Sequence, residues 1–284
     1  MTNQGASIGA RALLTVVKES SPGFFLDAGG DLGNILLPRN EVHGPCKPGE
    51  KVDVFIYCDS EDRPVATMKR PKAMPGEFAC LQCVATTGVG SFLDWGLAKD
   101  LLVPFREQSS RLDVGKSYVV YVYVDPESDR VVASRRINRF LSKDPPDYTP
   151  GQQVSLMVYA KTDLGYKAII NGRHSGVIFA SEVFAKPAPG EQLTGYIAKL
   201  RSDGKIDLTL QAPDQSKKDR IDELEARIEA ELKRRGGFWP LCDSSPPEDI
   251  HRALGVSKKA FKRATGALFK KRKITIGKDG IRSV

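Results

Sequence analysis

The sequence has few of the side chains from which catalytic and disulfide-stabilised proteins are built. Its 284 residues include three histidines and five cysteines. The histidines, at positions 43, 174 and 251, lie far apart and adjoin no other metal ligand, so they predict neither a catalytic nor a metal site. The cysteines are scattered and odd in number, which argues against a disulfide framework. No glycine-rich phosphate-binding loop occurs. We therefore expect no enzyme and no cofactor.

Long apolar runs are also missing. A membrane-spanning helix needs about 20 consecutive apolar residues, and the sequence has no such run. The first five residues lack the basic cluster and the apolar core of a signal peptide. We therefore expect a cytoplasmic protein with no membrane partner.

The positive charge is concentrated in the last quarter of the chain. Residues 1–213 carry 25 basic and 24 acidic side chains, whereas residues 214–284 carry 18 basic and 11 acidic ones. Of the formal net charge of +8, the C-terminal segment therefore supplies +7. A positive field confined to one segment is typical of a module that faces a polyanion.

A threefold repeat runs through the nearly neutral part of the chain. Each repeat has one glycine before a β-rich run, a second 14 residues later, and a third another 25 or 26 residues on. A register kept over three units indicates repeated domains. The nine glycines are Gly9, Gly23 and Gly49, then Gly76, Gly90 and Gly115, then Gly151, Gly165 and Gly190.

The residues between these glycines predict five short strands in each repeat. Apolar residues alternate along the first strand of each unit, and this pattern places Cys83 in the core and Cys80 outside. Five strands in roughly 65 residues, with glycine at the bends, are typical of a small Greek-key barrel of the OB type. We therefore predict a mainly β protein. The proline-rich connectors at residues 70–75 and 144–150 are expected to act as semi-rigid spacers between barrels.

Residues 7–70, 76–140 and 151–211 each resemble an S-one type RNA-binding domain. The resemblance rests on a glycine followed by Phe-Leu-Asp, a Leu-Leu-Pro strand and a Pro-Gly-Glu-Lys-Val turn. It implies that bases stack on aromatic side chains of the second strand. The residues in question are Phe25 and Phe92, with Lys167 and its neighbour Tyr166 in the third unit; Arg70, Arg135 and Arg136 are expected to flank the groove. Asp27 and Asp94 are expected to cap a bend in the strand, not to act as a catalytic pair.

The C-terminal segment predicts a winged helix. A helix over residues 217–235 is followed by a capping box at Ser245 to Glu248, a short helix ended by Gly255, a second helix capped by Ser257, and a hairpin over residues 274–284. Eight basic and no acidic side chains lie between residues 258 and 273. The spacing places Phe269 on the core face, and Gly266 suggests a close approach to a partner or to a neighbouring helix. The predicted nucleic-acid contacts are Lys258, Lys259, Lys262, Arg263, Lys270, Lys271 and Lys278.

We thus predict four domains, at residues 1–72, 73–145, 146–213 and 214–284. Three S-one barrels followed by this winged helix resemble the conserved-virulence-factor-B family of bacterial RNA-binding regulators. The resemblance implies RNA binding and post-transcriptional control of gene expression. Two alternatives stay open. One is a transcription regulator that binds duplex DNA through the winged helix, and the other is a protein-interaction scaffold on RNA polymerase or the ribosome.

Overall fold

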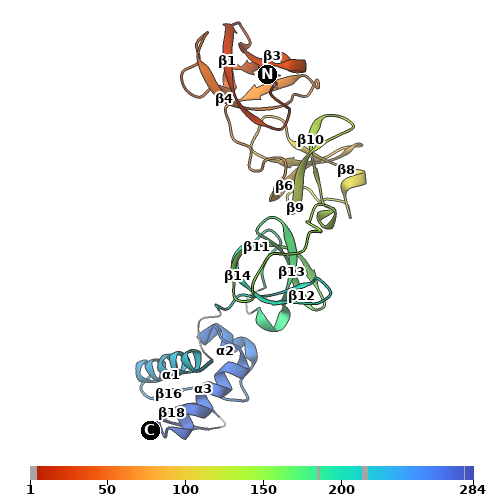
Figure 1. Cartoon of the computed structure of the whole chain (residues 1–284). Helices are drawn as coiled ribbons and strands as arrows, with labels where there is room; N and C mark the ends of the chain where they lie inside the picture. The colour runs from red at the N-terminus through yellow and green to blue at the C-terminus, as the bar shows by residue number, and fades with distance from the viewer. Residues whose placement is uncertain (1–4, 184–185, 213–216, 278) are drawn as a thin grey trace. The chain divides into compact units, whose positions relative to one another are not determined.

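A computed structural model describes residues 5–183, 186–212, 217–277 and 279–284 (Figure 1). The chain forms two compact units. The first comprises residues 1–144 with 172–174 and 189–191, and the second comprises 145–171, 175–188 and 192–284. The predicted mainly β fold is confirmed, with three helices confined to the C-terminal region of the described chain. The division into four domains stays a prediction.

The first repeat forms a closed barrel with strand order β1-β2-β3-β5-β4. All neighbours in the barrel are antiparallel except β3 and β5, which pair in parallel and close it. This closure removes the unpaired edges that five short strands would otherwise expose. The strands are β1 (Arg11–Glu19), β2 (Gly23–Gly29), β3 (Gly33–Pro38), β4 (Lys51–Cys58) and β5 (Pro64–Thr67).

The second repeat keeps the same strand order but is not closed by hydrogen bonds. Its sheet runs β10-β9-β6-β7-β8, so that β8 and β10 are edge strands with no ladder between them in this described part of the chain. The two strands still lie side by side, as β3 and β5 do in the first barrel, and we call the line where they meet the seam of the second barrel. The strands are β6 (Phe78–Thr86), β7 (Gly90–Asp94), β8 (Leu101–Pro104), β9 (Ser117–Asp125) and β10 (Arg130–Ser134).

The third repeat closes again, in the order β11-β12-β13-β15-β14. Its strands are β11 (Gln153–Thr162), β12 (Gly165–Ile170), β13 (His174–Phe179), β14 (Gln192–Leu200) and β15 (Ile206–Thr209). Single 3₁₀ turns follow several strands of the repeats, at Gly30–Leu32, Arg39–Glu41, Phe105–Glu107, Ile137–Arg139 and Ala180–Glu182.

One steric constraint explains why the second anchor residue of each repeat is glycine. A Cβ atom at Gly23, Gly90 or Gly165 would lie 2.1 to 2.3 Å from a backbone carbonyl oxygen of the next strand. Since real Cβ atoms do not approach backbone that closely, only glycine fits where these two strands meet. The regular spacing in the sequence therefore reports a packing constraint that all three barrels share.

Side chains from the outer side of the first barrel extend the hydrophobic core of the second. Phe55 and Tyr57 point out of the first barrel, because their neighbours Val54 and Ile56 fill its interior. Both aromatic rings pack against Trp95 of the second barrel. Burial raises the pKa of Tyr57 to about 12.

The connector between these two barrels contributes to the same core. Ala73 is 2% exposed within it, and the backbone N–H of Lys72 donates to the carbonyl of Trp95 at 2.7 Å. The prediction that residues 70–75 act as a spacer is therefore wrong. Alanine and proline in this segment are small and apolar enough to be buried between the barrels.

The C-terminal domain has three helices and a three-stranded sheet. Leu224, Ile228 and Leu232 of the first helix are buried in one core with Trp239 of the sheet. The strand order is β16-β18-β17, so the segment at Phe238–Trp239 is a strand of the wing. The elements are α1 (Lys217–Arg234), β16 (Phe238–Trp239), α2 (Pro247–Leu254), α3 (Lys258–Lys270), β17 (Ile274–Ile276) and β18 (Ile281–Ser283).

Most helix ends lie where the sequence predicts them, with one exception. The Ser257 side chain caps α3 by accepting from the Ala260 N–H at 3.2 Å, and Gly255 ends α2 at φ 70°. The predicted capping box at Ser245 is wrong, because α2 begins at Pro247 without a side-chain cap. The Ser245 hydroxyl instead accepts from the Cys242 N–H at 2.9 Å, which ties down the loop before the helix.

Candidate nucleic-acid interface

Phe25 and Phe92 occupy the same place on the first and second barrels. Each lies on the second strand of its repeat, two residues after the constrained glycine, and each is half-buried. Their neighbours Leu26 and Leu93 are fully buried in the cores, so the period-two alternation turns both phenyl rings outward. Half-exposed rings on a barrel surface are suitable platforms for unpaired bases.

A cation lies close to the Phe25 ring, and the sequence analysis did not identify it. The Lys18 ammonium lies 5.0 Å from the ring centroid, and Lys18 is the cross-strand partner of Phe25. A base stacked on Phe25 would therefore have a positive charge next to it for its phosphate. The antiparallel pairing of β1 with β2 is the signal that could have revealed this residue.

The third barrel differs at this position. Lys167 is half-buried, like Phe25 and Phe92, but Tyr166 is only 7% exposed and lies in the barrel core. Tyr166 is therefore not available for stacking, because it is one residue out of register with the outer face. Phe179 at the end of β13 is half-buried, and the Arg201 guanidinium lies 5.7 Å from its ring centroid.

The three arginines that follow the last strands of the first two barrels differ in their contacts. Arg70 is exposed. Arg135 donates to the Ser110 hydroxyl at 2.8 Å and lies over the Tyr118 ring, and desolvation lowers its pKa. Arg136 donates through Nε to a backbone carbonyl at 2.8 Å. Both are thus held by the second barrel itself, and their positions follow from tertiary contacts that the sequence pattern did not contain.

The two recurring aspartates have the structural role predicted for them. The backbone N–H of Gly29 donates to Asp27 Oδ1 at 3.0 Å, and that of Gly96 donates to Asp94 Oδ1 at 2.9 Å. Each carboxylate therefore closes a tight bend after the second strand.

The basic side chains of the C-terminal domain divide into engaged and free groups. Lys258 donates to the Ser245 carbonyl at 2.9 Å, Lys262 pairs with Asp243 at 3.5 Å, and Lys271 pairs with Glu225 at 2.6 Å. Lys278 lies outside the described residues. Three exposed cations of α3 have no ion-pair partner among the side chains that the structure describes: Lys259, Arg263 and Lys270.

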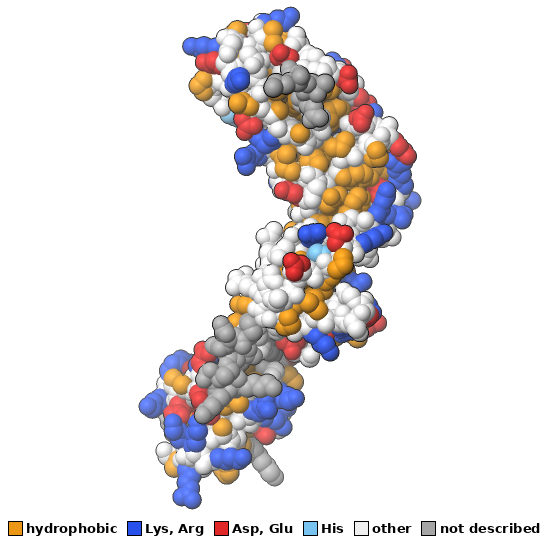
Figure 2. All heavy atoms as spheres, viewed as in Figure 1, with side chains coloured by type: hydrophobic (Ala, Val, Ile, Leu, Met, Phe, Trp, Pro, Cys, Tyr) orange, Lys and Arg blue, Asp and Glu red, His pale blue; other side chains and the backbone are white. Residues whose placement is uncertain are grey.

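These three cations lie on one face of α3, because they are spaced four and seven residues apart. Gly266 lies within this face, and a Cβ added there would meet nothing within 4 Å. A close approach to a neighbouring helix of the chain is therefore wrong, and a close approach to a partner stays a prediction. We call Lys259, Arg263, Gly266 and Lys270 the basic face of α3. Figure 2 shows Lys and Arg side chains gathered over the C-terminal domain.

Phe269 adjoins the basic face and is exposed. Its spacing predicts a core position beside Phe261 and Leu268, but Phe269 is 55% exposed whereas those two are fully buried. Because 100° per residue separates Phe269 from Leu268, a broad apolar stripe ends between them. An exposed phenyl ring next to three unpaired cations is a pairing that binds bases and phosphates together.

Within the described residues, no helix is long and apolar enough to cross a membrane, and no three metal-ligating side chains come together.

Comparison with known proteins identifies the relatives of this chain. Residues 8–69 match the S1 domain family, which is the S-one type, and residues 226–282 match the family described as CvfB-like winged helix domain. The chain is 24% identical to conserved virulence factor B of Staphylococcus saprophyticus, over 80% of this chain and 78% of the relative. The Staphylococcus aureus protein is 23% identical, over 87% of each chain.

The chain is homologous to conserved virulence factor B.

Two further matches cover nearly the whole chain. Uncharacterized protein YitL of Bacillus subtilis is 28% identical, over 94% of this chain and 90% of the relative. A crystal structure of a multidomain protein with nucleic acid binding domains from Streptococcus pneumoniae has 23% identity, a TM-score of 0.44 and 98% coverage of both chains. Since an S1 domain and a CvfB-like winged helix occur in one chain, the matches support a nucleic-acid-binding regulator. Neither matched family is a catalytic one.

Proposed function

We propose that this protein is a non-catalytic, cytoplasmic RNA-binding regulator that acts after transcription and binds single-stranded RNA. The observation that carries the proposal is the equivalence of Phe25 and Phe92, two half-exposed rings at one position of successive barrels. Base stacking needs unpaired bases, and a duplex does not offer them. Aromatic rings repeated at one position therefore favour a single strand.

The winged helix supplies the second part of the mechanism. Lys259, Arg263 and Lys270 have no carboxylate partner among the described side chains, so their charge is available to phosphates. Neutralising phosphates releases counterions and makes binding depend on salt. Phe269 adds a stacking surface beside these charges. Barrels and winged helix in one chain bind one strand at several weak sites, and the linkage raises the total affinity.

The test is a single substitution at the stacking position. Phe25→Ala is expected to weaken binding of a 12-nucleotide single-stranded RNA by about 1–2 kcal/mol, because one base loses its platform. Fluorescence anisotropy of the full-length protein at fixed salt measures the affinity. Leu13→Ala is the matched control, since Leu13 is 62% exposed on the neighbouring strand of the same barrel and is not aromatic. Equal affinities of both variants would contradict the proposal.

A duplex-DNA regulator is the second candidate, and the free cations of α3 favour it, because the second helix of a helix-turn-helix can enter a major groove. Phe269→Ala separates the two. We expect it to lower affinity for single-stranded RNA about tenfold and to leave the melting temperature unchanged, since the ring is exposed. If the variant binds RNA with normal affinity and binds duplex DNA more tightly than RNA, the protein is a duplex-DNA regulator and the proposal of single-strand binding is wrong.

A further inference from the structure

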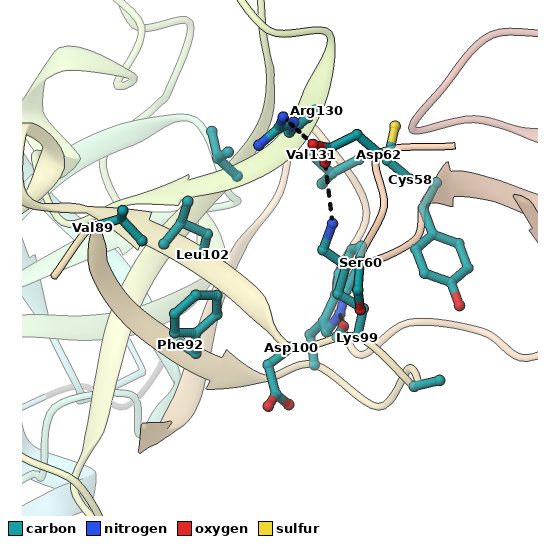
Figure 3. Close-up of a pocket in the computed structure, with 14 residues that line it drawn as sticks. Cys58, Ser60, Asp62, Val89, Phe92, Lys99, Asp100, Leu102, Arg130 and Val131 are labelled. Carbon is teal, nitrogen blue, oxygen red and sulfur yellow. Dashed lines mark hydrogen bonds and ion pairs between the residues drawn. The ribbon is translucent and has the colours of Figure 1, made fainter. Parts of the chain in front are cut away.

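A cavity lies between the first and second barrels, both of which belong to the first compact unit. Its volume is about 480 Å³, within the range of small-ligand sites. Figure 3 shows Phe92, Leu102 and Val89 on one side and Arg130, Asp62 and Lys99 on the other. The first barrel contributes the turn that carries Ser60 and Asp62, so the cavity exists only where the two barrels meet.

The cavity follows the seam of the second barrel. Leu102 of β8 and Val131 and Val132 of β10 line it, and these are the two strands that lack a ladder between them. In the first and third barrels the corresponding strands are joined by a parallel ladder, so a seam without a ladder beside an aromatic ring belongs to the second barrel.

The charges that line the cavity cancel. Asp62 forms ion pairs with Arg130 and, at 3.7 Å, with Lys99. Asp100 is the fourth charged residue, and burial raises its pKa. Two cations and two carboxylates have no net attraction for a phosphate. A neutral, planar group with polar edges fits these walls better, because it can lie on the phenyl ring and exchange hydrogen bonds with the polar side.

We propose that this cavity holds one unstacked nucleobase of the bound RNA strand. The base lies against the Phe92 ring, its polar edge faces Lys99, Asp62 and Arg130, and its phosphates stay outside. One nucleotide would then be bound jointly by two barrels, whereas Phe25 supports a base on an open surface. This inference rests on the proposed single-strand binding and adds where one base goes.

The experiment fills the cavity without touching the phenyl ring. Ser60 is exposed on the turn of the first barrel and lines the cavity, whereas its exposed neighbour Glu61 does not. We expect Ser60→Trp to weaken binding of a fluorescein-labelled 12-nucleotide polyuridine or polyadenine RNA about tenfold, the effect of one lost stack. Glu61→Trp is the matched control and is expected to bind within twofold of wild type. Anisotropy titrations of the full-length protein provide both values.

A second variant fills the cavity from the side that the second barrel contributes. Val89 is 63% exposed and belongs to the second barrel, so Val89→Trp should reproduce the tenfold loss with an unchanged melting temperature. Normal binding by both Ser60→Trp and Val89→Trp, together with a loss in Phe25→Ala, would overturn the cavity proposal and leave single-strand binding intact. Normal binding by Phe25→Ala, Phe92→Ala and both tryptophan variants would overturn the proposed function itself.

Discussion

Reversing the three free cations of α3, in the triple variant K259E/R263E/K270E, is expected to lower RNA affinity about 100-fold at 0.15 M salt. Each lost phosphate contact on a single strand removes about 0.7 from the slope of log affinity against log salt, which is about fourfold in affinity at this salt concentration. Three contacts give roughly 60-fold, and the added like-charge repulsion increases the loss. The slope itself should fall by about 2.

The salt series makes this result specific. A variant that was merely misfolded would lose affinity at every salt concentration, whereas loss of phosphate contacts should make the wild type and the variant converge as salt rises. Among single variants, Lys259→Glu is the test and Lys233→Glu is its matched control, since both lysines are exposed on helices of the same domain. An unchanged slope in the triple variant would mean that α3 does not contact phosphates.

The barrels and the wing could be predicted from the sequence because their constraints are local or periodic. The glycine spacing reports a close contact of two strands that recurs in each barrel, and Ser257 and Gly255 mark helix ends through their own backbone geometry. The inward position of Cys83 follows from alternation along one strand, and its thiol is fully buried. Phe25 and Phe92 follow instead from the resemblance to S-one type domains, and both rings face outward on their strands.

The rest depends on contacts between segments far apart in the chain. Tyr166 is different, because alternation along its own strand beside the outward Lys167 would already have placed its ring in the core. Phe269 has the spacing of a core residue, but the core of the small C-terminal domain is already filled by Phe261 and Leu268. The cavity beside Phe92 arises because a turn of the first barrel meets the seam of the second, and no pattern within either repeat contains that information.

Trp95→Ala is expected to lower the free energy of unfolding by about 3–5 kcal/mol, the usual cost of removing a buried aromatic ring. Trp95 is 2% exposed, packs edge-on against Phe55 at 5.8 Å, and donates through Nε1 to the Lys99 carbonyl at 2.5 Å. Urea unfolding followed by far-UV circular dichroism measures the loss. Trp95→Phe keeps a ring in place and should lose much less.

The same two variants also distinguish unfolding of the C-terminal domain from unfolding of the barrels. Because the chain has only two tryptophans, both variants leave Trp239 as the only tryptophan, and its fluorescence reports on the C-terminal domain. That transition should be the same in both variants while the circular-dichroism transition differs.

A double-mutant cycle then tests whether the first two barrels share a core. Phe55 belongs to the first barrel and Trp95 to the second, so in independent barrels the losses in Phe55→Ala and Trp95→Ala would add. Rings in contact instead give a coupling of about 0.5–1.5 kcal/mol. Additive losses would mean that the barrels fold separately. A measured coupling would show that the wall of the cavity beside Phe92 is fixed by both barrels, and base binding there would then require that they stay docked.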